Sequence, residues 1–331
     1  MNKQEKTIIT EINKYKNIAI YFHELPDLDA LGSSFALYHF LKKKFTKKNI
    51  KIIGLNTLNN SFTNNLFEYD KKIFSCSDNF YNQALAIVLD TSDVLRVYDQ
   101  SYKKCAKIVC IDHHITQTTF GHYMWIDHTY SACSQMLAQL FIDWDVSKMN
   151  KIVCTYLYTG IIADTGRFLY PSTTSETYQI VSKLIKIGVD REKVHNAMYQ
   201  KDKTFYDFRN YIFSRACFNF KYGFAWVKLP KKIYNRFHIK LKSSMVNTLA
   251  NINGINLWFT FYFDSNVKKW KCSIRSKNLP VNELVSKYNG GGHKLAAGAT
   301  FSKKSQMRFF VNDVKKYLYK YILLDNNKNR K

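Results

Sequence analysis

Four short segments of the chain carry acidic and imidazole side chains at spacings that suit metal-ion chemistry. The first has the pattern His-x-x-x-Asp-x-Asp, the second and fourth each offer one aspartate, and the third has the run Asp-His-His. Their residues are His23, Asp27, Asp29, Asp90, Asp112, His113, His114 and Asp164. If these groups meet, two carboxylates 4 Å apart repel each other by about 4 kcal/mol at an effective dielectric constant of 20. Such a cluster must bind protons or cations.

The mixture of ligand types in these segments favours one kind of metal ion. Carboxylate oxygens combined with imidazole nitrogens suit Mn²⁺ better than Ca²⁺. Four carboxylates can hold two divalent cations if one carboxylate is shared between them. Two cations about 3.5–4 Å apart are the usual device for displacement at phosphorus, because together they activate a water and neutralise the phosphate oxygens. The predicted chemistry is therefore phosphoester hydrolysis.

Apolar runs precede three of the four segments. Residues 17–22, 84–89 and 106–111 are short apolar runs typical of buried strands, and residues 150–163 have helical spacing and end next to Asp164. Carboxyl ends of parallel strands lie along one edge of a sheet, where ligands bind. We therefore expect the segments to converge at one edge.

The rest of the first half of the chain alternates in the same way. One more strand is predicted at residues 50–55, and helices are predicted at 29–45, 130–143 and 173–187. Strands that alternate with helices indicate an α/β domain with a mostly parallel sheet flanked by helices.

Each acidic position also has a purely structural interpretation. Asp27, Asp90 and Asp112 all follow strands, and an aspartate in that position often caps the next helix. A single histidine is more often a core or surface residue than a ligand. The combination of all four segments, each in its expected structural setting, favours the metal site.

The pattern changes near residue 200. Strand-like aromatic runs then alternate with helical segments at about 232–250, 281–289 and 303–323, which predicts a smaller α+β domain. The predicted organisation is a metal-binding domain at 1–190, a connecting helix at 191–212, a second domain at 213–325 and a frayed tail at 326–331.

A glycine run in the second domain offers a phosphate-binding site. Gly290, Gly291 and Gly292 precede His293, and consecutive glycines let backbone N–H groups approach a phosphate closely. Arg275 is able to bind a phosphate bidentately, and the neighbouring Ser276 adds a hydroxyl. The same glycines have a second interpretation as a flexible turn.

The net charge and the cysteines indicate which partners and which compartment to expect. The 331 residues have a net charge of +25, which favours anionic partners, although a compositional excess of lysine gives the same charge. The seven cysteines are scattered without a Cys-x-x-Cys pair, as expected in a reducing cytoplasm. No signal peptide and no membrane-spanning stretch are predicted.

These motifs resemble the DHH family of phosphoesterases. The similar segments are HELPDLDALGSS, VLDTSDVLR, IDHH and GIIADTGRF, and KCSIRSKNLPVNELVSKYNGGGHKLAAGA is similar to the DHHA1 domain. The resemblance covers about residues 10 to 325. It is greatest to the stand-alone subgroup that degrades very short RNA (nanoRNases) and dephosphorylates 3′-phosphoadenosine 5′-phosphate (pAp).

The resemblance implies a role for each residue. His114 would face the substrate phosphate or the leaving oxygen, and Asp112 would orient an imidazole. The implied metal ligands form two sets that share Asp90: His23, Asp27 and Asp90 for one cation, and Asp29, Asp90, His113 and Asp164 for the other. The substrate-binding residues would be Arg275, Ser276, Gly290, Gly291, Gly292 and His293, with the active site between the two domains.

The expected activity is two-metal hydrolysis of short oligoribonucleotides, pAp or both. The alternatives are hydrolysis of cyclic di-AMP or its linear product pApA, and a non-catalytic nucleic-acid-binding protein that exploits the positive charge. The expected partners are short oligonucleotides or small nucleotides, with a possible homodimer and no membrane association.

Overall fold

The computed structural model describes all residues except 55–65, 68–75, 116–119, 238–242, 266 and 329–331. The described chain divides into two compact units, Met1–Gln200 and Lys201–Lys331. The division falls inside the segment 191–212 that the sequence predicts as a connecting helix. Two helices occupy that segment: α8 (Arg191–Tyr199) belongs to the first unit and α9 (Lys203–Arg215) to the second.

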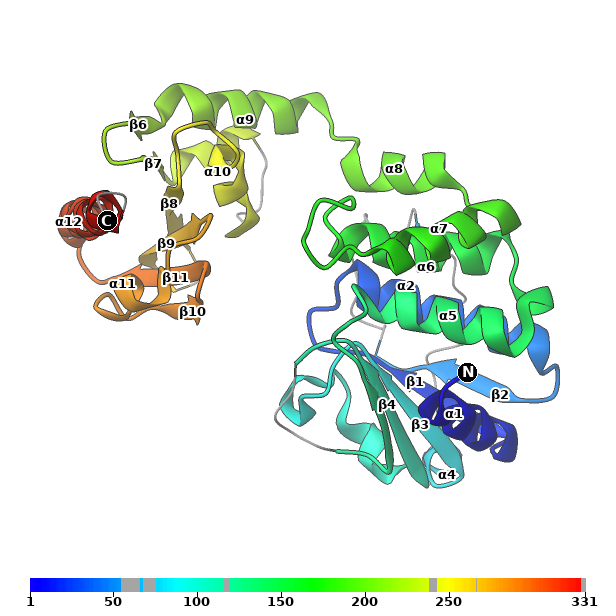
Figure 1. Cartoon of the computed structure of the whole chain (residues 1–331). Coiled ribbons are helices and arrows are strands. Elements are labelled where there is room, and N and C mark those ends of the chain that lie inside the picture. The colour runs from blue at the N-terminus through cyan, green and yellow to red at the C-terminus, as the bar shows by residue number, and fades with distance from the viewer. Residues whose placement is uncertain (55–65, 68–75, 116–119, 238–242, 266, 329–331) are drawn as a thin grey trace. The chain divides into compact units, whose positions relative to one another are not determined.

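A parallel sheet forms the centre of the first unit (Figure 1). Its strand order is β2-β1-β3-β4-β5, and every neighbouring pair is parallel. The predicted α/β fold is therefore confirmed, although the strand predicted at 50–55 ends at Ile52 and its last residue lies outside the described residues. The strands are β1 (Asn17–Tyr21), β2 (Asn49–Ile52), β3 (Ala84–Leu89), β4 (Lys107–Asp112) and β5 (Tyr123–Ile126).

The two faces of this sheet are covered differently, because alternate strand residues point to opposite sides. Ile18 and Ile87 pack with the long helices, whereas Ala86 and Val88 pack with the short ones. The long helices of the first face include α2 (Leu28–Lys44), α5 (Cys133–Asp145) and α6 (Lys151–Asp164), with α7 (Ser175–Ile187) beside α6. The short elements of the second face are α4 (Asp78–Tyr81), η3 (Val94–Arg96) and η4 (Gln100–Lys104).

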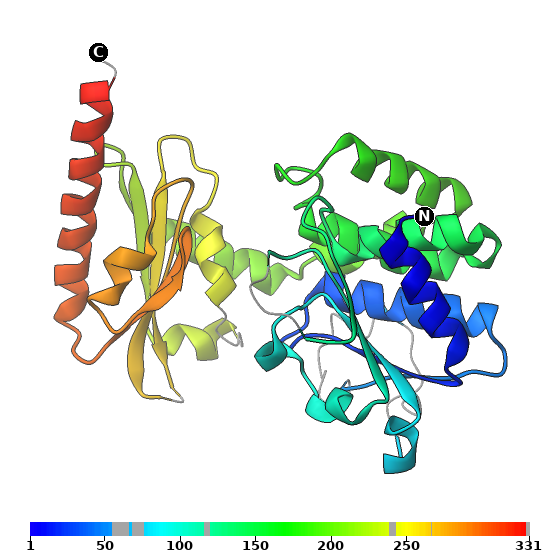
Figure 2. The same ribbon diagram turned by 60° about the horizontal axis from the view of Figure 1, so that its bottom comes forward.

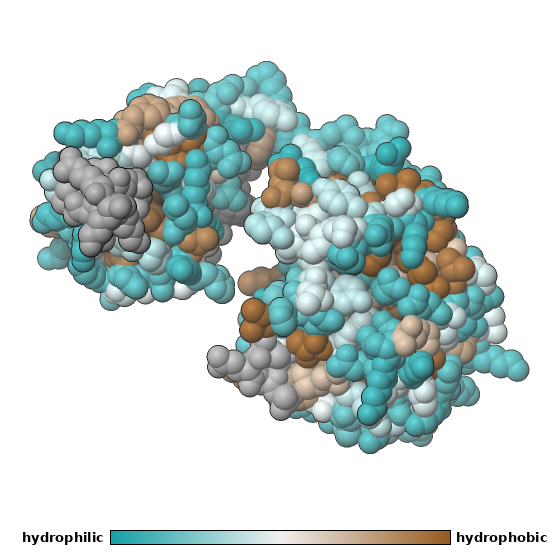
Figure 3. Space-filling view, viewed as in Figure 1, coloured by the Kyte–Doolittle hydropathy of each residue, from teal (hydrophilic) through white to brown (hydrophobic). Residues whose placement is uncertain are grey.

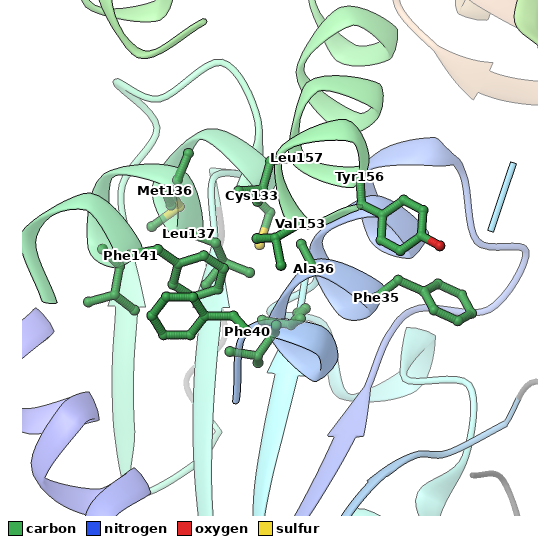
Figure 4. Close-up of a cluster of buried hydrophobic side chains, with 14 of the residues drawn as sticks. Phe35, Ala36, Phe40, Cys133, Met136, Leu137, Phe141, Val153, Tyr156 and Leu157 are labelled. Atoms are coloured by element: carbon green, nitrogen blue, oxygen red, sulfur yellow. The ribbon is translucent and has the colours of Figure 1, made fainter. Parts of the chain in front are cut away.

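Buried aromatic side chains hold the long helices together (Figure 4). Phe40 of α2 and Phe141 of α5 stack with ring centroids 3.9 Å apart, and Val153 and Leu157 of α6 complete the cluster. Burial of each such side chain stabilises the fold by about 1.5–3 kcal/mol. The three helices are thereby fixed relative to one another, so that the residues at their ends are fixed as well.

Two elements of this unit lie in segments where the sequence analysis predicted no structure. Helix α1 (Lys3–Lys14) begins with a capping box between Asn2 and Glu5 and buries Ile8 and Ile12 beneath an otherwise polar surface. Strand β5 has four residues, and α1 lies against it. Both elements are stabilised by packing against each other and the sheet, and that packing leaves little signal in a local window of sequence.

The second unit is built on a mixed sheet with the order β10-β11-β9-β8-β7-β6. Only β7 and β8 pair in parallel among its described strands. This sheet confirms the predicted α+β domain. Its strands are β6 (Cys217–Asn219), β7 (Phe224–Leu229), β8 (Leu257–Asp264), β9 (Lys269–Ser276), β10 (Gly291–His293) and β11 (Ala296–Phe301).

Helices cover both faces of this second sheet. Helix α12 (Gln306–Lys328) packs along one face, and it is the red helix in Figure 2. The opposite face of β7 and β8 is covered by α9, by α10 (Lys232–Phe237) and by η6 (Ser243–Leu249). A further short helix, α11 (Asn282–Ser286), lies beside β10 and β11.

Several predicted boundaries of the second unit need correction. The single helix predicted at about 232–250 is two separate helical segments, and residues 238–242 between them lie outside the described part of the chain. Helix α12 continues to Lys328 and so includes the first residues of the segment 326–331 that was predicted to be frayed.

Charged residues recur along the length of α12. No helix among the described residues is both long and apolar enough to cross a membrane.

Candidate metal centre

The loops after β1, β3 and β4 and the end of α6 bring the predicted residues together in the first unit. In each of three overlapping groups, the donor atoms lie within 4.8 Å of one another. Asp90 belongs to two of these groups. The groups are His23, Asp27 and Asp90; Asp29, His113 and Asp164; and Asp90, His113 and His114.

Asp90 lies between two imidazoles. Its Oδ2 is 3.5 Å from Nε2 of His23, and its Oδ1 is 3.4 Å from Nε2 of His113. Nε2 of His113 is also 3.2 Å from Oδ2 of Asp164 and 3.9 Å from Oδ2 of Asp29. The two oxygens of one carboxylate thus face two separate groups of ligand atoms.

Apart from the 3.2 Å between His113 and Asp164, these distances are long for hydrogen bonds and suit atoms that share a cation. Two ligand atoms that each lie about 2.1 Å from one cation are separated by about 3.0–3.5 Å. Both oxygens of Asp90 and Nε2 of His113 are buried and have no hydrogen-bond partner within the described chain. Buried polar atoms without partners are costly, so the residues present fit a pair of divalent cations.

The pKa values of two imidazoles also indicate that the carboxylates of the site require positive charge. Burial opposes protonation of His23, but the carboxylates of Asp27 and Asp90 outweigh it and raise its pKa to about 10. Burial likewise opposes protonation of His113, yet Asp164 and Asp90 raise its pKa to about 11. In the metal-free protein these two protons supply the positive charge that the carboxylates require.

The two oxygens of Asp27 have different surroundings, so its role as a helix cap does not exclude a role as a metal ligand. Its Oδ1 caps α2 by accepting hydrogen bonds from the N–H groups of Asp29 and Ala30, at 2.9 and 3.0 Å. Its Oδ2 remains directed at Nε2 of His23, 3.8 Å away. The cap orients the carboxylate, since one oxygen is fixed while the other stays available for a cation.

Hydrogen bonds from Nδ1 orient the rings of both His23 and His114. Nδ1 of His23 lies 2.7 Å from the carbonyl of Glu24, so Nδ1 donates a hydrogen bond there and Nε2 faces Asp90. Nδ1 of His114 lies 2.7 Å from Oδ1 of Asp112, which also accepts the His114 backbone N–H. That contact raises the pKa of His114, whose side chain is half exposed.

Asp29 is held by a helix N-terminus that the sequence analysis did not connect to the site. Its carboxylate accepts the backbone N–H groups of Cys133 and Ser134, at 2.6 and 2.9 Å, where α5 begins. The positive end of a helix favours a carboxylate. Burial nevertheless raises the pKa of Asp29, as do the charges of Asp90 and Asp164.

A close crossing of α2 and α6 leaves no room for side chains beside Asp29. A Cβ atom on Gly160 would lie 2.5 Å from Oδ1 of Asp29 and closer still to Oγ of Ser134. A Cβ atom on Gly32 would lie 2.6 Å from the carbonyl oxygen of Tyr156. The two glycines therefore let the helices approach closely enough to position Asp29 and Asp164.

The second unit holds a cavity of about 290 Å³ on its sheet, lined in part by Lys271, Arg275, Gly291 and Gly292. Arg275 donates to the carbonyl of Ile274 at 2.8 Å, and burial lowers its pKa. Because a guanidinium has five N–H donors, others remain for a ligand. Three of the predicted substrate-binding residues thus line this cavity, whereas Gly290, Ser276 and His293 do not.

Ser276, Gly290 and His293, which do not line the cavity, each have a different environment. The Ser276 hydroxyl is mostly buried and donates to the carbonyl of Leu279. Gly290 packs tightly, because a Cβ atom there would lie 2.6 Å from the carbonyl oxygen of Val285. His293 is exposed on β10. Their proposed contact with substrate stays a prediction.

The glycines of this run serve different purposes. Gly292 has φ +137°, where an L side chain is strained, and a Cβ atom there would meet β11. Gly291 has no positive φ, and a Cβ atom there would meet nothing within 4 Å. Since the fold does not require a glycine at 291, the open space beside it is available to a ligand.

We expect metal binding to weaken as the pH falls. The imidazoles of His23 and His113 have pKa values of about 10 and 11 in the metal-free protein, so both are protonated at pH 7 and cations must displace these protons. Calorimetric titration with Mn²⁺ at pH 7 in two buffers of different ionisation enthalpy measures the protons released. A heat of binding that does not depend on the buffer would contradict this account.

We expect Gly160→Ala to reduce Mn²⁺ affinity at least about 10-fold, because the new methyl group displaces Asp29, and to lower the free energy of unfolding by about 1–3 kcal/mol. The double variant Gly160→Ala/Ser134→Gly removes the clash with Ser134 but not the clash with Asp29. It should regain stability without regaining affinity. Recovery of both together would show that Gly160 has only a packing role.

We expect Gly291→Ala to keep the thermal stability of the protein while weakening adenosine 5′-monophosphate binding about 10-fold, since a methyl group is worth about 1 kcal/mol or more in a filled site. Gly290→Ala is the contrasting variant and should lower the melting temperature. Unchanged affinity in Gly291→Ala would count against a ligand beside Gly291.

Comparison with known proteins supports the same chemistry. Residues 17–161 match the N-terminal domain of the DHH family, and residues 231–320 match the DHHA1 domain. An uncharacterized protein of Mycoplasma genitalium is 35% identical over 95% of this chain and 96% of its own length. The bifunctional oligoribonuclease and PAP phosphatase NrnA of Bacillus subtilis is 33% identical over 88% of this chain and 92% of its own length.

A solved structure has the same fold over nearly the whole chain. The crystal structure of an exopolyphosphatase-related protein from Bacteroides fragilis matches with a TM-score of 0.82 at 25% identity, and covers 98% of this chain and 99% of that one. These matches confirm the resemblance carried by the four motifs and the glycine run. The chain belongs to the DHH family, joins its N-terminal domain to a DHHA1 domain, and is a metal-dependent phosphoesterase.

Proposed function

We propose that this phosphoesterase hydrolyses short oligoribonucleotides and pAp with the help of two divalent cations. The observation that carries the proposal is the position of Asp90, whose two oxygens face His23 and His113 separately at 3.5 and 3.4 Å. The choice of substrate is supported by the similarity to the NrnA protein of Bacillus subtilis, which is named for both activities.

The three groups of donor atoms support the two ligand sets that the family resemblance implies. Asp90 is the carboxylate shared by the two cations, which when bound would activate a water and neutralise phosphoryl oxygens. Imidazole among the carboxylates supports Mn²⁺ as the metal. The proposed ligands are His23, Asp27 and Asp90 for one cation, and Asp29, Asp90, His113 and Asp164 for the other.

His114 is the proposed proton donor to the substrate. Its Nδ1 is fixed on Asp112, which leaves Nε2 for an oxygen of the phosphate or of the leaving group. The hydrogen bond that Nδ1 donates to Asp112 raises the pKa of His114, which favours the protonated imidazole that a general acid requires. Asp112 itself is fully buried, and its proposed role is to fix the orientation of His114.

The second unit is the proposed site for the rest of the substrate. Arg275, Gly291 and Gly292 line its cavity and offer a guanidinium and backbone N–H groups, which suit a phosphate. Ser276, Gly290 and His293 are kept in this set by the family resemblance. A terminal phosphate bound here would select short substrates, since a long strand continues beyond such a site.

A reducing compartment suits this chain. All seven cysteines are free, and five of them are buried in the two units. We propose a cytoplasmic location, because thiols stay reduced in that compartment.

We expect Asp90→Asn to reduce turnover at least about 1,000-fold, because an amide is a poor ligand for two cations at once. The assay is a panel of pAp, a diribonucleotide, a longer oligoribonucleotide, pApA and cyclic di-AMP with added Mn²⁺, resolved by product chromatography. Asp207→Asn removes an exposed carboxylate of α9 and is the matched control for charge.

The panel also tests the substrate. The proposal predicts the fastest turnover for pAp and the diribonucleotide. Faster turnover of cyclic di-AMP than of both would overturn the substrate assignment, and near-normal turnover by Asp90→Asn would overturn the metal assignment.

A further inference from the structure

The four most exposed large hydrophobic side chains of the described chain lie close in sequence to the candidate metal ligands. Leu25 is 88% exposed, Ile115 86%, Leu95 85% and Leu169 74%, and every other large hydrophobic side chain in the described residues is less exposed. Single exposed apolar residues are ordinary. Four such residues, one close to each of the four segments that carry the candidate ligands, are not explained by chance exposure.

Each of these four residues lies within five positions of a candidate metal ligand along the chain. Leu25 lies between His23 and Asp27, and Ile115 directly follows His114. Leu95 and Leu169 each stand five residues after a ligand, namely Asp90 and Asp164.

Two of these loops are in direct contact. The N–H of Glu24 donates to the carbonyl of Arg96 at 2.6 Å, and His23 forms a β-bridge with Val97. Leu25 directly follows Glu24 and Leu95 directly precedes Arg96, so the two leucines belong to adjacent segments of backbone. Figure 3 shows that hydrophobic residues reach the surface of the first unit among hydrophilic ones.

The fold itself does not require a leucine at position 25. Its backbone has φ +54°, a conformation in which glycine or asparagine is less strained than leucine. The side chain also packs into no core, because it is almost fully exposed. Leu169 follows Arg167 and Phe168, which both have positive φ as well. Strained backbone that presents an apolar side chain at a reaction centre indicates a ligand contact.

We infer that Leu25, Leu95, Ile115 and Leu169 form an apolar rim that binds the base of the nucleotide whose phosphate lies at the metal centre. This inference rests on the proposed function. The base is the apolar part of a nucleotide, and the ribose keeps it close to the phosphate that the cations would hold. Every base has a hydrophobic face that aliphatic side chains can cover.

The aliphatic side chains of the rim also determine whether it selects among the four bases. Leucine and isoleucine side chains have no hydrogen-bond donors or acceptors, so they cannot read the edge of a base. The rim therefore gains affinity from any base without selecting among the four. Purine and pyrimidine dinucleotides should have KM values within about 3-fold of each other, because every base presents a face that an apolar side chain can cover.

The test compares a substrate that has a base with one that has none. KM and kcat are measured for pAp and for the base-free analogue ribose 3,5-bisphosphate, in wild type, Leu95→Asn and Ile115→Asn. Each variant should raise KM for pAp about 5-fold, because a lost apolar contact weakens binding by that order. KM for the base-free analogue and kcat for both compounds should stay within about 2-fold.

Two control variants separate this effect from others. Leu95→Met keeps an apolar side chain and should retain the wild-type KM for pAp. Phe309→Asn removes a side chain that is 62% exposed on α12 of the other unit and should change neither KM. Equal effects of Leu95→Asn on both compounds, or no effect on either, would overturn the inference.

Two further outcomes are informative. If Leu95→Asn and Ile115→Asn dissociate a dimer in sedimentation velocity without changing KM for pAp, the rim is an interface between copies of the chain and the inference is wrong.

If wild type hydrolyses neither compound, the proposed function fails. Calorimetric titration of the Mn²⁺-loaded protein then decides: tighter binding of pAp than of the base-free analogue supports the rim, and equal binding overturns it.

Discussion

Mutual repulsion between buried carboxylates is the constraint around which the first unit is built. Asp29, Asp90 and Asp164 all approach Nε2 of His113, and two carboxylates 4 Å apart would repel each other by about 4 kcal/mol at an effective dielectric constant of 20. Positive charge must offset this cost, either as protons on His23 and His113 or as cations. The parallel sheet brings three of the loops that carry candidate ligands to one edge, and the N–H groups at the start of α5 hold Asp29 in place.

The same site concentrates backbone strain. Asp90 has φ +60°, and Leu25, Arg167 and Phe168, which lie close in sequence to other candidate ligands, also have positive φ. Each such residue costs about 1–3 kcal/mol and persists only where surrounding structure enforces it. The stacked rings of Phe40 and Phe141, with the close crossing of α2 and α6, provide that rigid surrounding. The stability of the long helices thus maintains the geometry of the ligand loops.

The features that the sequence predicts best are those set by local pattern and chain direction. The apolar runs before Asp90 and Asp112 indicate strands, and parallel strands end at one edge, so the convergence of the ligand residues follows. The contacts of Cys133 and Ser134 with Asp29 join residues more than 100 positions apart, and no local pattern reports them. Strands β10 and β11 were missed because their small residues resemble a flexible turn, and only pairing with β9 makes them strands.

The central claim is that one carboxylate, Asp90, joins two cations. Electron paramagnetic resonance of the protein titrated with Mn²⁺ tests it most directly, because two manganese ions that share a carboxylate are spin-coupled. The account predicts that a coupled dinuclear signal grows until two equivalents are bound. A spectrum that contains only the six-line signal of isolated Mn²⁺ at saturation would contradict it.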